Sequence, residues 1–209
     1  MKKLGLFFFV LSSLLFACEN TPKVPQRKTD GAPVSKNMEN KILVPSEEGG
    51  VDFWVDNECS QGPPPATVSY KKKPEGYTYN LNKQQGYAKE VMFMDNGYKL
   101  DITSKGCNSI WVTHSYFFPL EDLDLNNAPV VSQRVLELIE KTTAFSNPPI
   151  DIKAKLQPLK MAVEQLGPFK IGEEFILNDG DVKETFAIDR LETNGEKIFL
   201  QYYFTKGPL

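Results

Sequence analysis

SIWVTHSYFF, at residues 109–118, consists mainly of β-branched and aromatic residues. Such side chains pack well on a pleated surface, so this segment predicts a β-strand. Upstream of it, Asn96-Gly97 separates two alternating segments, residues 87–94 and 98–103. Asn and Gly accept the positive φ that a tight hairpin turn requires. The middle of the chain therefore predicts a hairpin followed by a further strand.

Earlier strands are predicted around a proline-rich loop. Gly62-Pro63-Pro64-Pro65 cannot lie in a helix or a central strand, because proline lacks a backbone N–H. Residues 51–55 precede this loop and predict the first strand of the domain. Residues 67–70 and 77–81 follow it and predict a second hairpin, with a long loop.

Two helices are predicted after Pro129, where the apolar period changes. The first has one apolar face, formed by Val131, Val135, Leu138, Ile139 and Thr142. The second has a stripe at spacings of four and three, formed by Ile152, Leu156, Leu159, Val163 and Leu166. Pro158 lies inside this stripe, so we expect the regular helix to begin near Gln157, with the proline in its first turn.

The last third of the chain returns to strands. Turn residues at 178–181 and at Asn194-Gly195 separate three further segments, at residues 169–177, 184–191 and 197–205. The sequence thus predicts an α+β fold with antiparallel β-sheet segments, two short central helices and a C-terminal three-stranded meander. The meander is expected to join the first sheet or to pack against it.

The N-terminus has the layout of a secretory signal. Two lysines, at positions 2 and 3, precede an almost unbroken apolar run at residues 4–16, which is too short for a transmembrane helix. The segment Leu15-Phe16-Ala17-Cys18 resembles the lipid-attachment box of bacterial lipoproteins. This resemblance implies cleavage before Cys18 and a lipid, such as palmitate, that anchors Cys18 to a membrane. The alternative is an ordinary cleaved signal followed by a chance cysteine.

These features divide the chain into three parts. They are a signal peptide at residues 1–17, a lipidated Cys18 with a disordered stalk at residues 18–41, and a single α+β globular domain at residues 42–209. Three prolines and a low aliphatic content are typical of a disordered stalk. Glu19 follows Cys18. Where aspartate at this position retains lipoproteins in the inner membrane, its absence favours the outer membrane of the cell envelope, which the resemblance therefore implies as the location.

The net negative charge of the chain argues against a polyanionic partner. The chain has 24 basic and 27 acidic residues, and the predicted signal removes two of the lysines and no acid. An acidic body repels polyanions, so we expect no nucleic-acid partner.

Cys59 and Cys107 are the cysteines left after Cys18. An even pair in an exported chain predicts a disulfide bond, and two buried free thiols are the alternative. A metal site is disfavoured because the chain has one histidine and no Cys-x-x-Cys spacing. We therefore expect no metal and no cofactor.

Catalytic signatures are missing from the sequence. No nucleophile elbow, phosphate loop or His-Glu-x-x-His motif occurs, and His114 is expected to be a partly exposed strand residue. Asp122-x-Asp124-x-Asn126 resembles the start of a calcium loop, but Asn127 stands where glycine is required. We expect a solvated acidic loop that caps the following helix. A carboxylate-dependent envelope enzyme carries no local signature and stays open as an alternative.

Aromatic residues are the remaining candidates for binding. The first predicted sheet holds a group of tyrosines, Tyr70, Tyr77, Tyr79, Tyr87 and Tyr98. Tyrosines are frequent in protein contacts and stack on sugars, although a packed aromatic core is the simpler interpretation. In the last strand, consecutive Tyr202, Tyr203 and Phe204 must occupy both faces, so at least one of them is expected outside the core.

The sequence therefore predicts a membrane-anchored, non-enzymatic binding module for a protein or glycan partner, acting as a surface binder or adhesin. A periplasmic inhibitor, immunity or envelope-assembly lipoprotein is the alternative.

Overall fold

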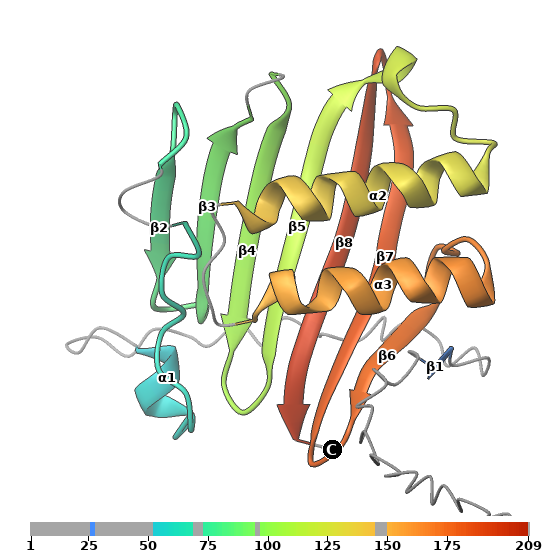
Figure 1. Ribbon diagram of the computed structural model, residues 1–209. Helices are drawn as coiled ribbons and strands as arrows, with labels where there is room; N and C mark the ends of the chain where they lie inside the picture. Colours follow the sequence, from blue (N-terminus) through green and yellow to red (C-terminus); the bar gives the residue numbers. More distant parts are fainter. Residues whose placement is uncertain (1–25, 28–51, 69–72, 95–96, 145–149, 209) are drawn as a thin grey trace, which may run out of the picture.

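One antiparallel sheet runs through the chain. The computed structural model describes residues 26–27, 52–68, 73–94, 97–144 and 150–208 (Figure 1). The strands lie in the order β1-β6-β7-β8-β5-β4-β3-β2. Their bounds are β1 Gln26–Arg27, β2 Thr78–Asn82, β3 Tyr87–Phe93, β4 Lys99–Gly106, β5 Ile110–Pro119, β6 Glu174–Asp179, β7 Val182–Asn194 and β8 Lys197–Pro208. Because β8 pairs with β5, the C-terminal strands continue the first sheet.

Two long helices cover one face of this sheet (Figure 1). They are α2, Ala128–Thr143, and α3, Ile152–Leu166. A short helix, α1 at Phe53–Asp56, lies beside the β2–β3 end, and a 3-10 turn at Leu120–Asp122 follows β5. The predicted α+β class is confirmed, with the sheet as its dominant part.

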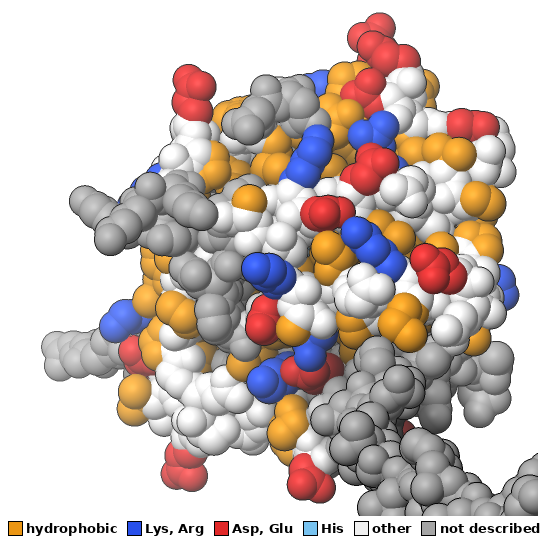
Figure 2. Space-filling model, in the orientation of Figure 1, with side chains coloured by type: hydrophobic (Ala, Val, Ile, Leu, Met, Phe, Trp, Pro, Cys, Tyr) orange, Lys and Arg blue, Asp and Glu red, His pale blue; other side chains and the backbone are white. Residues whose placement is uncertain are grey.

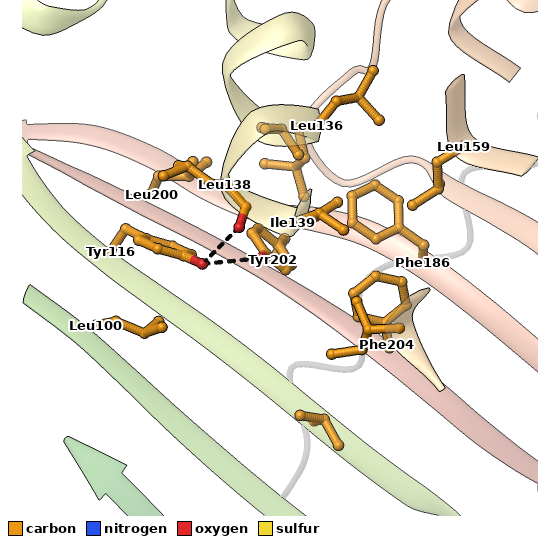
Figure 3. Close-up of a cluster of buried hydrophobic side chains, with 14 of the residues drawn as sticks. Leu100, Tyr116, Leu136, Leu138, Ile139, Leu159, Phe186, Leu200, Tyr202 and Phe204 are labelled. Atoms are coloured by element: carbon orange, nitrogen blue, oxygen red, sulfur yellow. Dashed lines mark hydrogen bonds between the residues drawn. The ribbon is translucent and has the colours of Figure 1, made fainter. Parts of the chain in front are cut away.

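The core lies between the sheet and the two helices (Figure 3). Every residue of the predicted α2 face is buried, and the side chain of Asn127 caps the helix by accepting a hydrogen bond from the Val130 N–H, 3.3 Å. Under α2, the Tyr116 hydroxyl lies 3.2 Å from the Leu138 carbonyl and 2.5 Å from the Thr142 hydroxyl. Burial raises the pKa of Tyr116 to about 12, so this phenol stays protonated and can donate.

The first predicted strand, residues 51–55, is wrong, because Phe53–Asp56 forms helix α1. The Asp52 carboxylate caps this helix by accepting from the Trp54 N–H, 3.2 Å. The Trp54 indole is buried and donates to the Gly106 carbonyl, 2.8 Å. Phe53 packs on Gly86, where a Cβ atom would lie only 2.2 Å from its ring. These contacts with the β2–β3 turn and with β4 outweigh the local strand preference.

The expected start of the second helix is also wrong. Helix α3 begins at Ile152, and Pro158 lies in its interior. Asp151 caps it by accepting from the Ala154 N–H, 3.1 Å. Ile152 is buried six residues before the proline, and Leu159 is buried just after it. Burial on both sides of Pro158 compensates for the hydrogen bond that proline cannot donate.

The helix side of the molecule is a surface of mixed charge (Figure 2). Lys and Arg side chains alternate there with Asp and Glu, as in the pair Lys160–Glu140, whose Nζ–Oε2 distance is 3.1 Å. Such interspersed charge is typical of a solvated surface. The other face of the sheet has a different composition.

Candidate functional site

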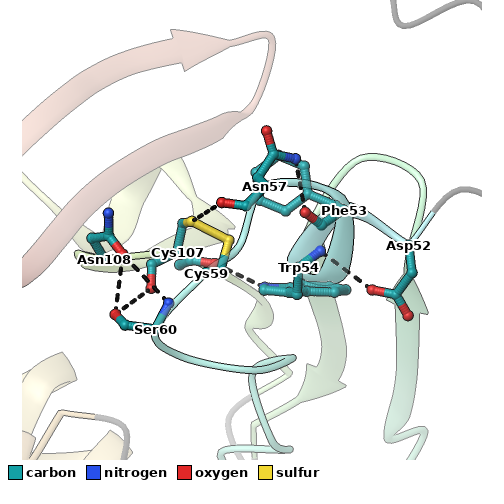
Figure 4. Close-up of a disulfide and its surroundings, with 9 residues drawn as sticks. Asp52, Phe53, Trp54, Asn57, Cys59, Ser60, Cys107 and Asn108 are labelled. Atoms are coloured by element: carbon teal, nitrogen blue, oxygen red, sulfur yellow. Dashed lines mark hydrogen bonds between the residues drawn. A yellow bond between two sulfur atoms is a disulfide. The ribbon is translucent and has the colours of Figure 1, made fainter.

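The predicted disulfide between Cys59 and Cys107 is present (Figure 4). It joins the loop after α1 to the β4–β5 turn, next to the buried Trp54. The Ser60 hydroxyl donates to the Asn108 side-chain oxygen, 3.1 Å, across the same junction. This bond therefore attaches the N-terminal loop to the end of the central hairpin.

The predicted tyrosines do not form one surface. Cys18 and Tyr70 lie outside the described residues. Tyr98 is buried and stacks on Phe118, with ring centroids 5.0 Å apart. The other three are half-buried or exposed and lie on β2, on β3 or just before β2, at positions Tyr77, Tyr79 and Tyr87.

Two of these tyrosines hold a buried carboxylate and a loop in place. The Glu90 side chain is 1% exposed, and its Oε2 accepts from the Tyr77 hydroxyl, 2.7 Å. Its Oε1 accepts from the Thr67 N–H, 2.9 Å, and from the Thr67 hydroxyl, 2.7 Å. Tyr79 donates to the Pro64 carbonyl, 2.7 Å. Burial and the nearby Glu90 raise the pKa values of Tyr77 and Tyr79 above their usual range, so both phenols stay protonated and act as structural donors.

The other candidates from the sequence also have structural partners. Asp122 accepts from the Tyr98 hydroxyl, 2.5 Å, and Asp124 accepts from the Asn126 N–H, 3.0 Å. Within the described ranges, no cluster of three or more His, Cys, Asp or Glu side chains could hold a metal ion, and neither of these carboxylates belongs to such a cluster.

The expectation that His114 is partly exposed is wrong. Its side chain is fully buried between Tyr202 and Phe204, with ring centroids 5.0 and 6.3 Å away. It points to the helix side, because it shares one face of β5 with the buried Val112 and Tyr116. Burial lowers the pKa of His114 to about 3, so the ring is neutral.

The face of the sheet opposite the helices carries large aromatic side chains. We call it the open face. Its main residues point away from the helices on the neighbouring strands β3, β4, β5 and β8, and they are Phe93, Lys99, Asp101, Trp111, Phe117, Phe199, Gln201 and Tyr203. An antiparallel sheet with one solvated face normally alternates apolar residues inward with polar residues outward. The open face departs from that pattern at both ends.

One end of the open face holds a phenylalanine group. Phe117 and Phe199 pack with ring centroids 5.0 Å apart, and the Lys99 ammonium lies 4.9 Å above the Phe117 ring. Phe93 is 49% exposed in the same cross-strand row. Asp101 occupies the next row, and its Oδ1 lies 3.0 Å from the Lys99 Nζ.

The opposite end holds Trp111, which is 38% exposed and packs on Tyr203 with ring centroids 5.2 Å apart. Beside Trp111 the sheet surface is hollowed by about 120 Å³. The hollow is lined by Ser109, Trp111, Glu174, Lys183, Thr185, Thr205, Lys206, Gly207 and Pro208. Tyr87 lies in the same cross-strand row as Trp111, with Lys105 between them. One predicted tyrosine therefore shares this row.

Sequence reasoning did not select Trp111, Tyr203 or Glu174 as site residues. The available signal was the alternation in residues 109–118, which places Trp111 and Phe117 on the face opposite His114 and Tyr116. The prediction that one of the three consecutive aromatics lies outside the core is confirmed by the half-buried Tyr203.

No helix in the described part of the chain is long and apolar enough to cross a membrane. Comparison of the chain with protein-family models, with curated protein sequences and with solved structures found no match.

Proposed function

We propose that this chain is a lipid-anchored binding protein of the bacterial outer membrane, and that the open face is its contact surface. The observation that carries the proposal is the aromatic composition of the sheet face opposite the helices. Exposed aromatic patches with polar surroundings mark interaction sites more often than ordinary surface. Trp and Tyr are also the residues that contribute most to binding energy in protein contacts.

The arrangement favours binding over catalysis. Glycoside hydrolysis, one carboxylate-dependent reaction of cell envelopes, generally uses two acids that flank the scissile bond. Among the described residues that line the hollow, Glu174 is the only carboxylate. The buried Glu90 is saturated by hydrogen bonds from Thr67 and Tyr77. A non-enzymatic role therefore agrees best with the groups present.

Photo-crosslinking in cells tests the contact surface. Benzoylphenylalanine is introduced in place of Phe93 on the open face or, in a matched control, in place of Val130 on α2. The two native side chains are 49% and 42% exposed, so the two probes have similar access to solvent. We expect discrete adducts from the Phe93 position and none from Val130. Equal labelling from both positions, or none from Phe93, would contradict the proposal.

The anchor is tested separately. Metabolic labelling with an alkyne analogue of palmitate is expected to mark the chain and to fail in Cys18→Ser, because this variant lacks the thiol that would take the lipid. A native chain that takes no label, or a Cys18→Ser variant that is still labelled, would show that the lipid anchor is wrong.

The side of the outer membrane on which the domain lies decides between a surface binder and a periplasmic protein. Protease added to intact cells removes a domain on the cell surface, as a surface binder requires. Protection until lysis favours the alternative, a periplasmic inhibitor, immunity or envelope-assembly protein.

A further inference from the structure

We propose that the hollow beside Trp111 binds a single pyranose ring of a glycan, with the indole as its stacking platform. This inference rests on the proposed function, because it names the ligand chemistry of one end of the open face. Four features of the hollow support it: its floor, its wall, its polar rim and its place in the sheet.

The floor is made by a difference in side-chain size. Thr205 on β8 lies directly opposite Trp111, and Thr185 on β7 lies directly opposite Thr205, so two small residues continue the row that begins at the indole. Their hydroxyls are 2.7 Å apart. At Gly207 a Cβ atom would lie 2.1 Å from the Ser109 hydroxyl oxygen, so only glycine leaves room for that hydroxyl at the rim. The result is a depression between larger neighbours.

The wall is a supported aromatic ring. Trp111 is inclined by 40° to Tyr203, and this contact limits the positions available to the indole. One face of a pyranose is a patch of C–H groups, which packs on an aromatic face with the same geometry as other apolar contacts of tryptophan. A platform that is already ordered loses little side-chain entropy when a ligand binds.

The rim supplies hydrogen-bonding groups for a ring of hydroxyls. Glu174 is an acceptor, Lys183 is a donor, and the threonine hydroxyls can be either. The Tyr203 hydroxyl donates to the Glu174 carboxylate, 3.3 Å, which orients the acid toward the hollow's edge. Burial and Glu174 raise the pKa of Tyr203 above its usual range, which keeps this donor protonated.

The size and position of the hollow distinguish a sugar from a peptide. The hollow, about 120 Å³ in volume, is open to solvent, so one face of a single ring can lie in it while the outward hydroxyls stay hydrated. An apolar peptide side chain would desolvate Glu174 and Lys183 without giving them partners, which is unfavourable. An added peptide strand needs an unpaired sheet edge, whereas β8 and β7 are both paired on two sides.

Nuclear magnetic resonance of the two indole N–H groups tests this assignment on the full chain, kept in a zwitterionic detergent that contains no sugar. The chain has two tryptophans, so Trp54 is an internal control, buried and bonded to Gly106. The probes are maltotetraose, cellotetraose, N-acetylchitotetraose and sialyllactose. Sorbitol, an open-chain polyol, is the control ligand without a ring.

We expect at least one ring probe to shift the Trp111 signal saturably, with a dissociation constant near 1 mM as a single small ring allows, while Trp54 and the sorbitol titration stay unchanged. Glu174→Gln should weaken this binding about tenfold. In Trp111→Ala, the same probe should no longer perturb the backbone amides of Thr185 and Thr205, whereas Trp111→Phe should retain part of the effect.

The assignment is overturned if no ring probe shifts Trp111 more than sorbitol does at concentrations of about 20 mM, well above the expected constant. It is also overturned if Trp111→Ala leaves binding intact. Crosslinks from Phe93 to a protein, together with no response to any ring probe, would keep the open face as a contact surface and exclude a sugar subsite. If Phe93 gives no crosslinks and no ring probe shifts the Trp111 signal, the proposed function is excluded as well.

Discussion

His114 stacks on Tyr202 with the two ring centroids 5.0 Å apart and the ring planes inclined by 21°. Both imidazole nitrogens are buried, and neither has a hydrogen-bond partner among the residues that the structure describes. A neutral ring can be accommodated in this aromatic cluster, whereas an imidazolium there would be strongly destabilised.

The free energy of unfolding should consequently fall in mild acid. Burial lowers the pKa of His114 from its usual 6.5 to about 3 in the folded state. Between these two values the unfolded chain binds a proton that the folded chain does not, so stability decreases as the pH falls, by up to about 1.4 kcal/mol per pH unit from this group. Urea unfolding at pH 7 and at pH 4.5 measures the loss. In His114→Phe the same comparison should show a smaller loss, and an unchanged loss would contradict this origin.

Removing the charge of Glu90 should destabilise the fold. In Glu90→Gln one carboxylate oxygen becomes an amide group, which faces donors from Thr67 or Tyr77 instead of accepting from them. Loss of charge-assisted hydrogen bonds in a buried site costs about 3 kcal/mol. Tyr77→Phe removes a single donor and should cost about half as much. Chemical denaturation of both variants checks the order, and an equal effect of the two would argue against Glu90 as the centre of this network.

Loss of the disulfide should lower stability mainly through the unfolded chain. Cys59 and Cys107 are 48 residues apart, and a loop of this length stabilises a fold by up to about 4 kcal/mol in the chain-entropy model. Thermal melting of the double variant Cys59→Ser, Cys107→Ser should show the decrease. A reducing agent should lower the melting temperature of the native chain to that of the variant and leave the variant itself unaffected.

Replacing Pro158 should stabilise helix α3. Pro158→Ala gives the helix an N–H that can donate to the Ala154 carbonyl, one turn earlier, and removes a steric conflict. The gain expected is about 1–2 kcal/mol, because proline also restricts the unfolded chain. Gln157→Ala, at the exposed neighbouring position, serves as the control and should change stability by less than about 0.5 kcal/mol. Lower stability of Pro158→Ala would show that the proline ring itself contributes packing.

The parts of the fold that depend on local pattern were predictable. The α2 face is an example, since Val131, Val135 and Leu138 follow the helical period and are all buried. The pairing of Cys59 with Cys107 was predictable from the count of cysteines. The helix at Phe53–Asp56 was not, because its stability comes from Trp54 packing near Gly106, 52 residues away.

The candidate site was less predictable than the fold. The tyrosines were grouped by sequence position, yet Tyr98 contacts Phe118 in the core while Tyr87 lies on the opposite side of the sheet. Residue type alone does not separate a stacking platform from a core residue. That distinction depends on which side of each strand the helices cover.

By itself, the sequence determined most of the strands and the existence of the two long helices, because side-chain period and turn residues act over a few positions. The alternation in residues 109–118 even divides that strand into two faces, but both faces carry aromatics, so the pattern does not say which face is buried. Only the tertiary structure decided that question, by packing α2 and α3 over the face that holds His114 and Tyr116. It also brought β8 beside β5, which set Thr205 next to Trp111 and formed the hollow. Such long-range register follows from the total apolar area that the whole chain can bury, and no short segment contains that information.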